Sequence, residues 1–519
     1  MRKLSRRDFL KVGAAGASVG LLQAYGPAVV RAAAAASSVK RGGTFTFANT
    51  GGIQEFNPFS LIQGHYPYMR ALYNTLARYD AELRPQPELA EKWEFSADGK
   101  TITLKLRQGV KFHSGREFTS ADVKHSVEFS QTNEKATMRT LYRVIKQVET
   151  PDKYTVALKF DSVNPGVFDI LDTLYIIDKE TIEDRFKTVV GTGPFRLDKY
   201  IPNDRAEFVP FKDYWEVGKP YLDRYVMRLI PDVSALTVNL EAGAIDCAWL
   251  ISNLDGARLL GMGGKYVVDT GAPGFGFDLA INVTVDPFTN KKVRQAIAWS
   301  IDRERFCKTV FRGMAEPTCL MWPPHSWAYF KDLEGKIGYD LDKARALLKE
   351  AGLEKGFQTE ILTASKQAFG YGELAQILQA DLRKIGVNAR VLDVEVAVYD
   401  NRHMVKGDIV MMVHTYGRAG RDPGSLVTGA RAWVNGWKEG NWTHFESPEW
   451  ERWRKELNST LDMERRKAAA RKLQEIALDE CFSNPVAPSQ RLFAYPSYVK
   501  GFGYTMDNSI YVGDMWLDK

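Results

Sequence analysis

A chain of 519 residues is too long for one hydrophobic core, because cores stop growing at about 250–300 residues and longer chains divide into domains. Hydrophobic residues make up 45% and charged residues 26% of the chain, which excludes a disordered protein and one embedded in a membrane. The formal net charge is +6, but residues 1–36 hold six Lys and Arg against one Asp, a net of +5. The remainder is therefore near neutral, and no basic run favours a nucleic-acid partner.

The N-terminal segment has the order of a secretory signal peptide: a charged stretch over 1–11, an apolar Gly/Ala-rich run over 12–30, and small residues to 38. Ser5-Arg-Arg-Asp-Phe-Leu-Lys11 resembles the twin-arginine export signal; an ordinary basic export signal is the alternative. Glycines and Pro27 interrupt the apolar run, which makes it a poor permanent anchor. We expect residues 1–36 to be a cleaved twin-arginine signal peptide and the mature protein to be periplasmic.

The first half of the mature chain mixes strand-like and helix-like patterns. Polar and apolar residues alternate in short runs, which predicts strands, while apolar residues spaced three or four apart predict helices. Asp98-Gly99 between two alternating runs is typical of a hairpin turn. The predicted elements are a strand over 44–48, a helix over 68–79, a hairpin over 92–107, a helix over 121–131 and a strand over 153–160.

The second half continues with strands that alternate with helices, which indicates α/β layers. Before it, Gly191-Thr-Gly-Pro-Phe195 suits a chain crossing between domains, because glycine supplies unusual dihedrals and proline fixes the exit. The predicted helices are 290–311, 340–351, 372–385, 448–461 and 463–479, and the predicted strands are 275–281, 358–362, 389–392 and 409–413.

Several blocks resemble the extracellular solute-binding proteins of peptide, nickel and related importers, known as family 5. The similar blocks are Leu89-Ala-Glu-Lys-Trp-Glu-Phe-Ser-Ala-Asp-Gly-Lys-Thr101, the stretch from Leu106 to Val123, Gly191-Thr-Gly-Pro-Phe195, Val293-Arg-Gln-Ala-Ile-Ala-Trp-Ser-Ile-Asp-Arg303 and Tyr339 to Leu348 with Ala351-Gly352. They occur in the family's order from about residue 42 to the C-terminus, so the resemblance is specific for the fold and the general role.

The resemblance implies an α/β, two-lobed periplasmic binding protein fold of the large three-domain, cluster C type, with the ligand cleft between the lobes. On this sequence, the implied divisions are lobe I (42–78, 193–278 and 493–519), an accessory domain (79–192) and lobe II (279–492). Family members capture a small solute such as a peptide, opine or oligosaccharide, and hand it to the permease and ATPase subunits of an ABC importer. We expect a monomer with this function, no catalytic activity and no cofactor.

Catalytic and metal-binding patterns are missing from the sequence. The seven histidines form neither H-E-x-x-H nor a close ligand pair, so no metal site is predicted; because nickel-type members can use histidine, His414 is a possible exception. The four cysteines lack C-x-x-C, and either a Cys307–Cys319 disulfide or four free buried thiols is expected. The alternatives to an importer component are a secreted hydrolase with a dispersed triad and a sensory binding protein that serves a chemoreceptor.

One segment of the sequence corresponds to the ligand-binding block of the family's peptide-binding members. That block has the form Trp-x-x-Asp-x-x-Asp/Glu-Pro, and its first acidic residue pairs with the free α-amino group of the ligand. In the segment 415–425, Tyr416 takes the aromatic position and Asp422 begins the final Asp-Pro pair. Ala419 occupies the position of the amino-binding aspartate, which argues against a simple peptide with a free N-terminus.

Arginine and aromatic residues supply further candidates for the site. Arg418 and Arg421 favour a ligand with a carboxylate or phosphate group, unless they face solvent or pair with structural acids. Clefts use aromatic faces for rings and aliphatic chains, although most tryptophans pack in ordinary cores. The remaining expected ligand-binding residues are Trp249, Trp433, Gln54 in the loop over 50–57, and Phe275 in the strand over 275–277.

Overall fold

The computed structural model describes residues 39–53, 56–59, 66–80, 83–134, 136–181, 189–271, 274–417, 421–505 and 508–519. The predicted signal peptide over 1–36 lies outside these ranges, as do the site candidates Gln54, Arg418 and Ala419. Among the described helices, none combines the length and the apolar character that a membrane crossing requires.

The largest sheet has seven strands in the order β12-β18-β11-β1-β10-β9-β8. Strand β1 (Thr44–Asn49) lies parallel to β10 (Arg224–Leu229) and β11 (Cys247–Trp249) on its two sides. Its alternating pattern buries Phe45 and Phe47 completely. The other elements here are β8 (Phe195–Ile201), β9 (Arg205–Pro210), β12 (Tyr266–Asp269), β18 (Phe493–Pro496), α1 (Tyr66–Leu72), α5 (Val233–Glu241), α6 (Asn253–Leu260) and the pair β19 (Val499–Lys500) and β20 (Trp516–Leu517).

A four-stranded antiparallel sheet in the order β4-β5-β7-β6 shares one continuous hydrophobic core with the seven-stranded sheet. We call these two sheets and their helices the first body. The predicted hairpin is confirmed, with Gly99 at φ +66° in its turn. Its elements are β4 (Ala90–Phe95), β5 (Thr101–Leu106), β6 (Ile145–Asp152), β7 (Thr155–Phe160), α2 (Ser120–Thr132), α3 (Arg139–Tyr142), α4 (Val167–Thr173), and the pair β2 (Ala77–Tyr79) and β3 (Pro85–Pro87).

The second body is built on a five-stranded sheet in the order β15-β14-β16-β13-β17. Strand β13 (Phe275–Ile281) pairs antiparallel with β16 (Met411–Gly417) and with β17 (Ser483–Pro488). The other elements are β14 (Phe357–Thr363), β15 (Val387–Asp393), α7 (Lys291–Ser300), α8 (Arg303–Val310), α9 (Leu341–Glu350), α10 (Tyr371–Arg383), α11 (Val396–Asp400), α12 (Pro423–Gly429), α13 (Pro448–Asn458) and α14 (Met463–Glu480).

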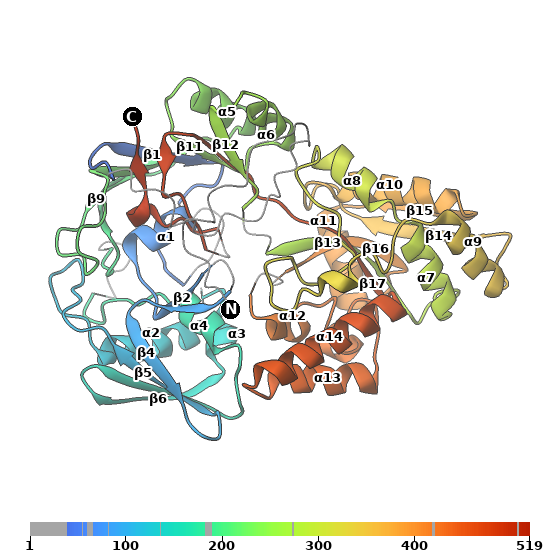
Figure 1. The fold of residues 1–519 in the computed structure, drawn as a ribbon, viewed down its shortest axis with the longest axis horizontal. Helices are drawn as coiled ribbons and strands as arrows, with labels where there is room; N and C mark the ends of the chain where they lie inside the picture. The colour runs from blue at the N-terminus through green and yellow to red at the C-terminus, as the bar shows by residue number, and fades with distance from the viewer. Residues whose placement is uncertain are drawn as a thin grey trace, which may run out of the picture.

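Figure 1 shows the two bodies side by side. In the second body, β13 starts on the side that faces the first body, and β17 ends on that side. The chain passes between the bodies from β12 to β13 and returns from β17 to β18. Two crossings that lie together form a natural hinge, because a few connecting residues can absorb the dihedral changes of a rigid-body rotation.

Two predicted helices differ from the structure, in each case because polar side chains end a helix early. The helix expected over 68–79 ends at Leu72, since Asn74 and Thr75 turn inward to bind the buried carboxylate of Glu88 at 2.8 and 2.6 Å. The helix expected over 290–311 is split into α7 and α8, because Asp302 caps α8 by accepting a hydrogen bond from the Arg305 amide.

The glycines of the 191–195 segment allow a close approach between backbones. A Cβ at Gly191 would lie 2.0 Å from the carbonyl oxygen of Leu72, and one at Gly193 would lie 2.4 Å from that of Ala71. His113 reaches the same segment, with its Nε2 3.0 Å from the Gly193 carbonyl oxygen, and burial lowers its pKa to about 4. These residues therefore fix helix α1 against the chain that leads into β8.

Candidate functional site

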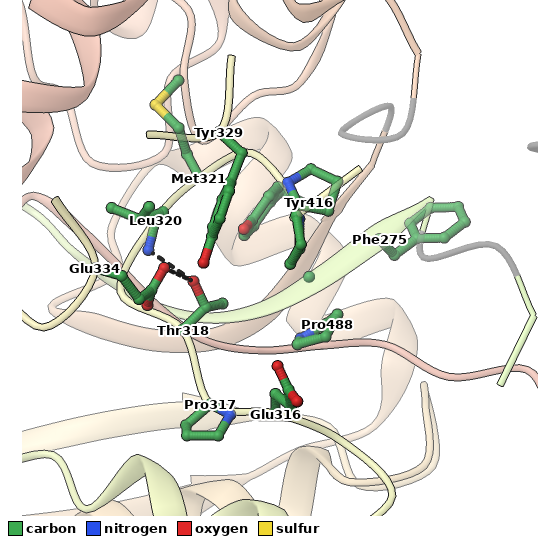
Figure 2. A pocket seen from close by; sticks show the side chains of 13 residues that line it. Phe275, Glu316, Pro317, Thr318, Leu320, Met321, Tyr329, Glu334, Tyr416 and Pro488 are labelled. Atoms are coloured by element: carbon green, nitrogen blue, oxygen red, sulfur yellow. Dashed lines mark hydrogen bonds between the residues drawn. The ribbon is translucent and has the colours of Figure 1, made fainter. Parts of the chain in front are cut away.

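A pocket that is open to solvent lies in the second body beside the two chain crossings. Its floor is formed by the start of β13, the end of β16 and the end of β17, and its cover is the loop that follows α8 (Figure 2). Two predicted ligand-binding residues, Phe275 and Tyr416, are brought together in it. The full lining is Phe275, Gly276, Glu316, Pro317, Thr318, Leu320, Met321, Pro323, Pro324, Tyr329, Glu334, Tyr416 and Pro488.

The two aromatic residues of the floor each lie across a glycine of the neighbouring strand. In the ladder between β13 and β16, Gly276 is paired with Tyr416, and Phe275 is paired with Gly417. A Cβ at Gly276 would lie 2.6 Å from the Tyr416 hydroxyl, and one at Gly417 would lie 2.9 Å from the Phe275 ring. A glycine opposite an aromatic residue gives the ring space to lie over the strand, so both glycines shape the pocket.

Tyr416 is held from behind by a buried aromatic cluster. Its ring meets the ring of Trp433 edge-on at a centroid distance of 5.5 Å. Trp433 is completely buried and packs on Phe482 and Trp450. Trp433 was expected to line a cleft; the structure instead places it behind the pocket, where it fixes the orientation of Tyr416.

The covering loop is tied down through Glu334. The Glu334 carboxylate accepts hydrogen bonds from the Cys319 amide at 3.0 Å and from the Thr318 hydroxyl at 3.2 Å. The Thr318 amide in turn donates to the Val486 carbonyl of β17 at 3.1 Å. Burial, together with the charge of Glu334 and a hydrogen bond to it, raises the pKa of Tyr329 to about 12, so Tyr329 is a neutral phenol at physiological pH.

Trp249, another expected ligand-binding residue, lies in the first body and not in this pocket. It is fully buried and stacks on Phe493 of β18 at 5.6 Å, with its rings 12° from parallel. Its indole nitrogen has no hydrogen-bond partner among the residues that the structure describes. Arg491 is a residue that the sequence did not single out. It lies on the return crossing, and its guanidinium is 5.1 Å over the exposed ring of Phe275.

Asp422 has structural partners in the second body. It caps α12 by accepting the Gly424 amide at 2.9 Å, and its carboxylate pairs with the buried guanidinium of Arg466 at 2.5 Å. Its own amide donates across the gap between the bodies to Asp169 of α4, at 3.2 Å. The neighbouring Arg421 is also buried.

Asp169 is the counterpart of this contact in the first body. Its carboxylate also accepts a hydrogen bond from the Tyr79 hydroxyl at 2.8 Å. Burial, opposed by the charge of Arg421 and reinforced by that of Asp422, raises the pKa of Asp169 to about 6.

One buried set of a serine, a histidine and an aspartate does not have the geometry of a catalytic triad. Asp278 lies in the middle, with His414 Nε2 2.8 Å from one of its oxygens and the Ser483 hydroxyl donating to the other. A nucleophile must instead contact the histidine that takes its proton. All three side chains are buried in the sheet, and the described residues include no group of three or more His, Cys, Asp and Glu that could hold a metal ion.

The fold and the pocket define a binding protein of two α/β bodies joined by two crossings. The chain belongs to the bacterial extracellular solute-binding proteins, family 5, whose model (the Middle region) matches residues 84–435. Proteins of this family are periplasmic and bind small solutes for the permease and ATPase subunits of ABC importers, and the chain is a solute-binding component of this type.

The chain is similar to several characterised binding proteins. It is 30% identical to the dipeptide-binding protein of Escherichia coli K12 over 69% of its length and 73% of that protein. It is 31% identical to the glutathione-binding protein GsiB of Salmonella typhimurium LT2 over 62% of its length, a match that spans 64% of the relative, just under two thirds. The periplasmic binding protein DppA of Helicobacter pylori, solved with the peptide STSA, is 26% identical with a TM-score of 0.72, over 92% of this chain and 99% of that one.

Sequence reasoning missed the covering loop of the pocket, including Glu316, Tyr329 and Glu334. These residues come from one loop that follows α8, and they converge only because that loop folds back on β17. A sequence signal did exist for the floor, since Phe275-Gly276 and Tyr416-Gly417 are two aromatic-glycine pairs, one at the start of the strand predicted over 275–281 and one shortly after the strand predicted over 409–413.

Proposed function

We propose that this protein captures a short peptide or a peptide-like amino-acid conjugate in the periplasm and delivers it to the permease of an ABC importer. The observation that carries the proposal is the aromatic pocket beside the hinge of a family 5 fold, whose walls include Phe275 and Tyr416. The relatives named for dipeptide and glutathione binding, and the neighbour solved with a tetrapeptide, support this class of solute. We propose that the protein is monomeric and has no catalytic role.

The proposed mechanism is closure of the two bodies over the solute. The lobes expected from the sequence were 42–78, 193–278 and 493–519 with the accessory domain 79–192, and 279–492. Because β13 (Phe275–Ile281) belongs wholly to the sheet of the second body, the proposed boundary moves to the crossing before β13, and the hinge falls there and at the return crossing after β17. A solute that contacts both bodies shifts the equilibrium toward the closed form by its differential affinity for that form. We also propose that the solute is contacted at the cleft by Gln54, Arg418, Ala419 and Asp422.

Native mass spectrometry of the mature protein, purified from its own periplasm, tests the proposal directly. A tightly bound solute survives purification, and denaturation then releases it for identification. We expect a short peptide or an amino-acid conjugate. Release of an oligosaccharide or a metal chelate in its place would overturn the solute class while leaving the importer role intact.

Two further measurements separate the alternative functions. A secreted hydrolase would convert the released compound on incubation at 37 °C, whereas a binding protein returns it unchanged. A sensory role would give a complex with a chemoreceptor domain, and delivery to an importer would give solute-dependent binding to the permease. N-terminal sequencing of the periplasmic protein tests whether residues 1–36 are a cleaved signal peptide, for which we expect cleavage within residues 32–36.

A further inference from the structure

The pocket contains two carboxylates that lack a positively charged partner. Glu316 and Glu334 both line it (Figure 2), and no lysine, arginine or histidine of the described part of the chain forms an ion pair with either. We propose that this pocket binds the ammonium group of the solute, with Glu316 and Glu334 supplying the negative charge. This inference rests on the proposed function, because it assigns a chemical group of the solute to a place in the binding site.

A second, independent feature also points to a ligand. Tyr416 is only 4% exposed, yet its hydroxyl has no hydrogen-bond partner among the described residues and faces the pocket (Figure 2). The described side-chain atoms that are both shielded from solvent and without a partner do not include this oxygen, so it is open to a group that enters the pocket. A phenol oxygen can accept a hydrogen bond, which is what an ammonium N–H requires.

The walls of the pocket suit an organic cation better than a metal ion. The rings of Phe275, Tyr329 and Tyr416 surround the space, and aromatic faces attract ammonium groups through the ring quadrupole. The apolar lining of Leu320, Met321 and the prolines can accommodate the carbon atoms next to a charged nitrogen. A divalent ion would instead demand several oxygen ligands around one point.

The two carboxylates differ in their electrostatic surroundings. The charge of Arg303 acts on Glu334 from the neighbouring groove that Glu334 also lines, but the Arg303 guanidinium donates to the carbonyl oxygens of Pro485 and Ala298 at 2.8 and 3.3 Å and forms no ion pair with Glu334 in the described part of the chain. Glu334 keeps its neutral donors, the Cys319 amide, the Thr318 hydroxyl and the Tyr329 phenol, while Glu316 is exposed at the mouth. An ammonium group would thus enter past Glu316 and meet Glu334 deeper in the pocket, without need of an acid at residue 419.

The experiment compares solutes that differ only in the charge of one nitrogen. Isothermal titration of the mature protein would use three probes, Met-Leu, Ser-Thr-Ser-Ala and glutathione, each with a free and with an acetylated amino group. Hydrogen bonds to charged groups are stronger than neutral ones, so we expect acetylation to weaken binding at least about tenfold. The same pairs are titrated against Glu316→Gln, Glu334→Gln and, as a matched control for loss of a surface charge, Glu449→Gln on α13 (61% exposed).

The proposal predicts that the preference for the free amine falls to about threefold or less in Glu316→Gln and Glu334→Gln and is unchanged in Glu449→Gln. Equal binding of free and acetylated probes by the wild type would overturn it, as would a preference that survives both glutamine substitutions. If Glu334→Gln fails to fold because it loses its support of the covering loop, Glu316→Gln decides alone, since that side chain has no hydrogen-bond partner in the described structure.

A simpler pair of probes distinguishes this inference from the proposed function. Butylammonium and butanol have the same size and differ in charge, and neither is a peptide. If no peptide probe binds but butylammonium binds more tightly than butanol in a Glu316-dependent way, the cation site stands and the peptide function fails. If peptides bind while butylammonium shows no advantage over butanol and acetylation has no effect, the peptide function stands and the cation site fails.

Discussion

The phenol ring of Tyr416 occupies the space where a side chain at residue 276 would stand. A Cβ at Gly276 would lie 2.6 Å from both Cζ and the hydroxyl oxygen of Tyr416, closer than any van der Waals contact allows. Because Trp433 supports the ring from behind, Tyr416 cannot retreat into the core, and the ring must move toward the pocket. The absence of a side chain at residue 276 therefore sets the shape of the solute site.

We predict that Gly276→Ala weakens solute binding by about tenfold or more while costing about 1–3 kcal/mol of stability, the usual range for overpacking. Urea unfolding and titration with the solute identified from the periplasm measure the two effects. The matched control is Gly503→Ala, where the added Cβ would meet only Tyr511, at 3.8 Å, and we expect changes within about 0.5 kcal/mol. Unchanged affinity in Gly276→Ala would show that Tyr416 does not shape the site.

Asp169 makes the stability of the protein depend on pH in a predictable direction. Burial raises its pKa to about 6 from an ordinary value of 3.8, so the folded state binds a proton more tightly than the unfolded state between about pH 4 and pH 6. The contribution of this group to the free energy of unfolding therefore falls as the pH rises through that window and is constant above it. The total fall is about 2–3 kcal/mol.

Asp169→Asn removes the titration and retains an oxygen that can accept from Tyr79 and from the Asp422 amide. We expect the variant to match the wild type at pH 4 and to be more stable by about 2–3 kcal/mol at pH 7, as measured by urea unfolding. Asp161→Asn, at a 76% exposed side chain of the first body, is the control and is expected to show no such difference. If the variant is less stable than the wild type at pH 7, the ionised Asp169 carboxylate must stabilise the contact with the second body at Asp422.

The sequence predicted most of the fold because the patterns that form strands and helices are local. The strand expected over 275–281 matches β13 residue for residue, and the helix expected over 463–479 is α14 with one residue added. The helix expected over 68–79 was wrong beyond Leu72, because its end depends on Glu88, which lies between β3 and β4.

The site was less predictable, because it depends on which residues meet across strands and loops. Phe275 and Tyr416 were expected from family-like positions and do share a pocket. Trp249 and Trp433 were chosen for their aromatic character alone, and both are fully buried, since periodicity does not reveal which face of an element is covered by a distant loop. Glu316 and Glu334 had no sequence signal, because they become neighbours of Tyr416 only when the loop after α8 folds over β17.

The four cysteines are free and buried in the structure, which favours thiols over the Cys307–Cys319 disulfide that the sequence left open. Burial raises the pKa of Cys307 and of Cys481 to about 12, so the reactive thiolate is scarce at neutral pH. We predict no reaction of the native protein with Ellman's reagent at pH 8 and release of four equivalents in guanidinium chloride without reductant. Two equivalents in the denatured protein would reveal a disulfide.

Asp422 combines a helix cap with a buried ion pair, and we predict that its loss destabilises the second body. The Asp422 and Arg466 side chains are 8% and 5% exposed, with 2.5 Å between the paired atoms. Asp422→Ala would leave the Arg466 guanidinium buried without its carboxylate, which costs about 3–5 kcal/mol. If Asp422 instead binds the solute, as its place in the ligand-binding block suggests, the same substitution would alter binding or closure and leave folding intact. Urea unfolding and solute titration on one variant therefore separate the two roles.

The matched control for the capping role is Asp232→Ala. Asp232 caps α5 by accepting the Ala235 amide at 2.8 Å from an exposed position, so its loss should cost only about 1 kcal/mol. The excess cost of Asp422→Ala over this control measures the ion pair. In a double-mutant cycle, Arg466→Met should recover about 1 kcal/mol or more in the Asp422→Ala background, because it removes the unpaired charge. A different result would show that Asp422 binds the solute and does not support the fold. In that case the two aspartate substitutions would lower the free energy of unfolding equally, Arg466→Met would show no coupling, and Asp422→Ala would lose solute affinity.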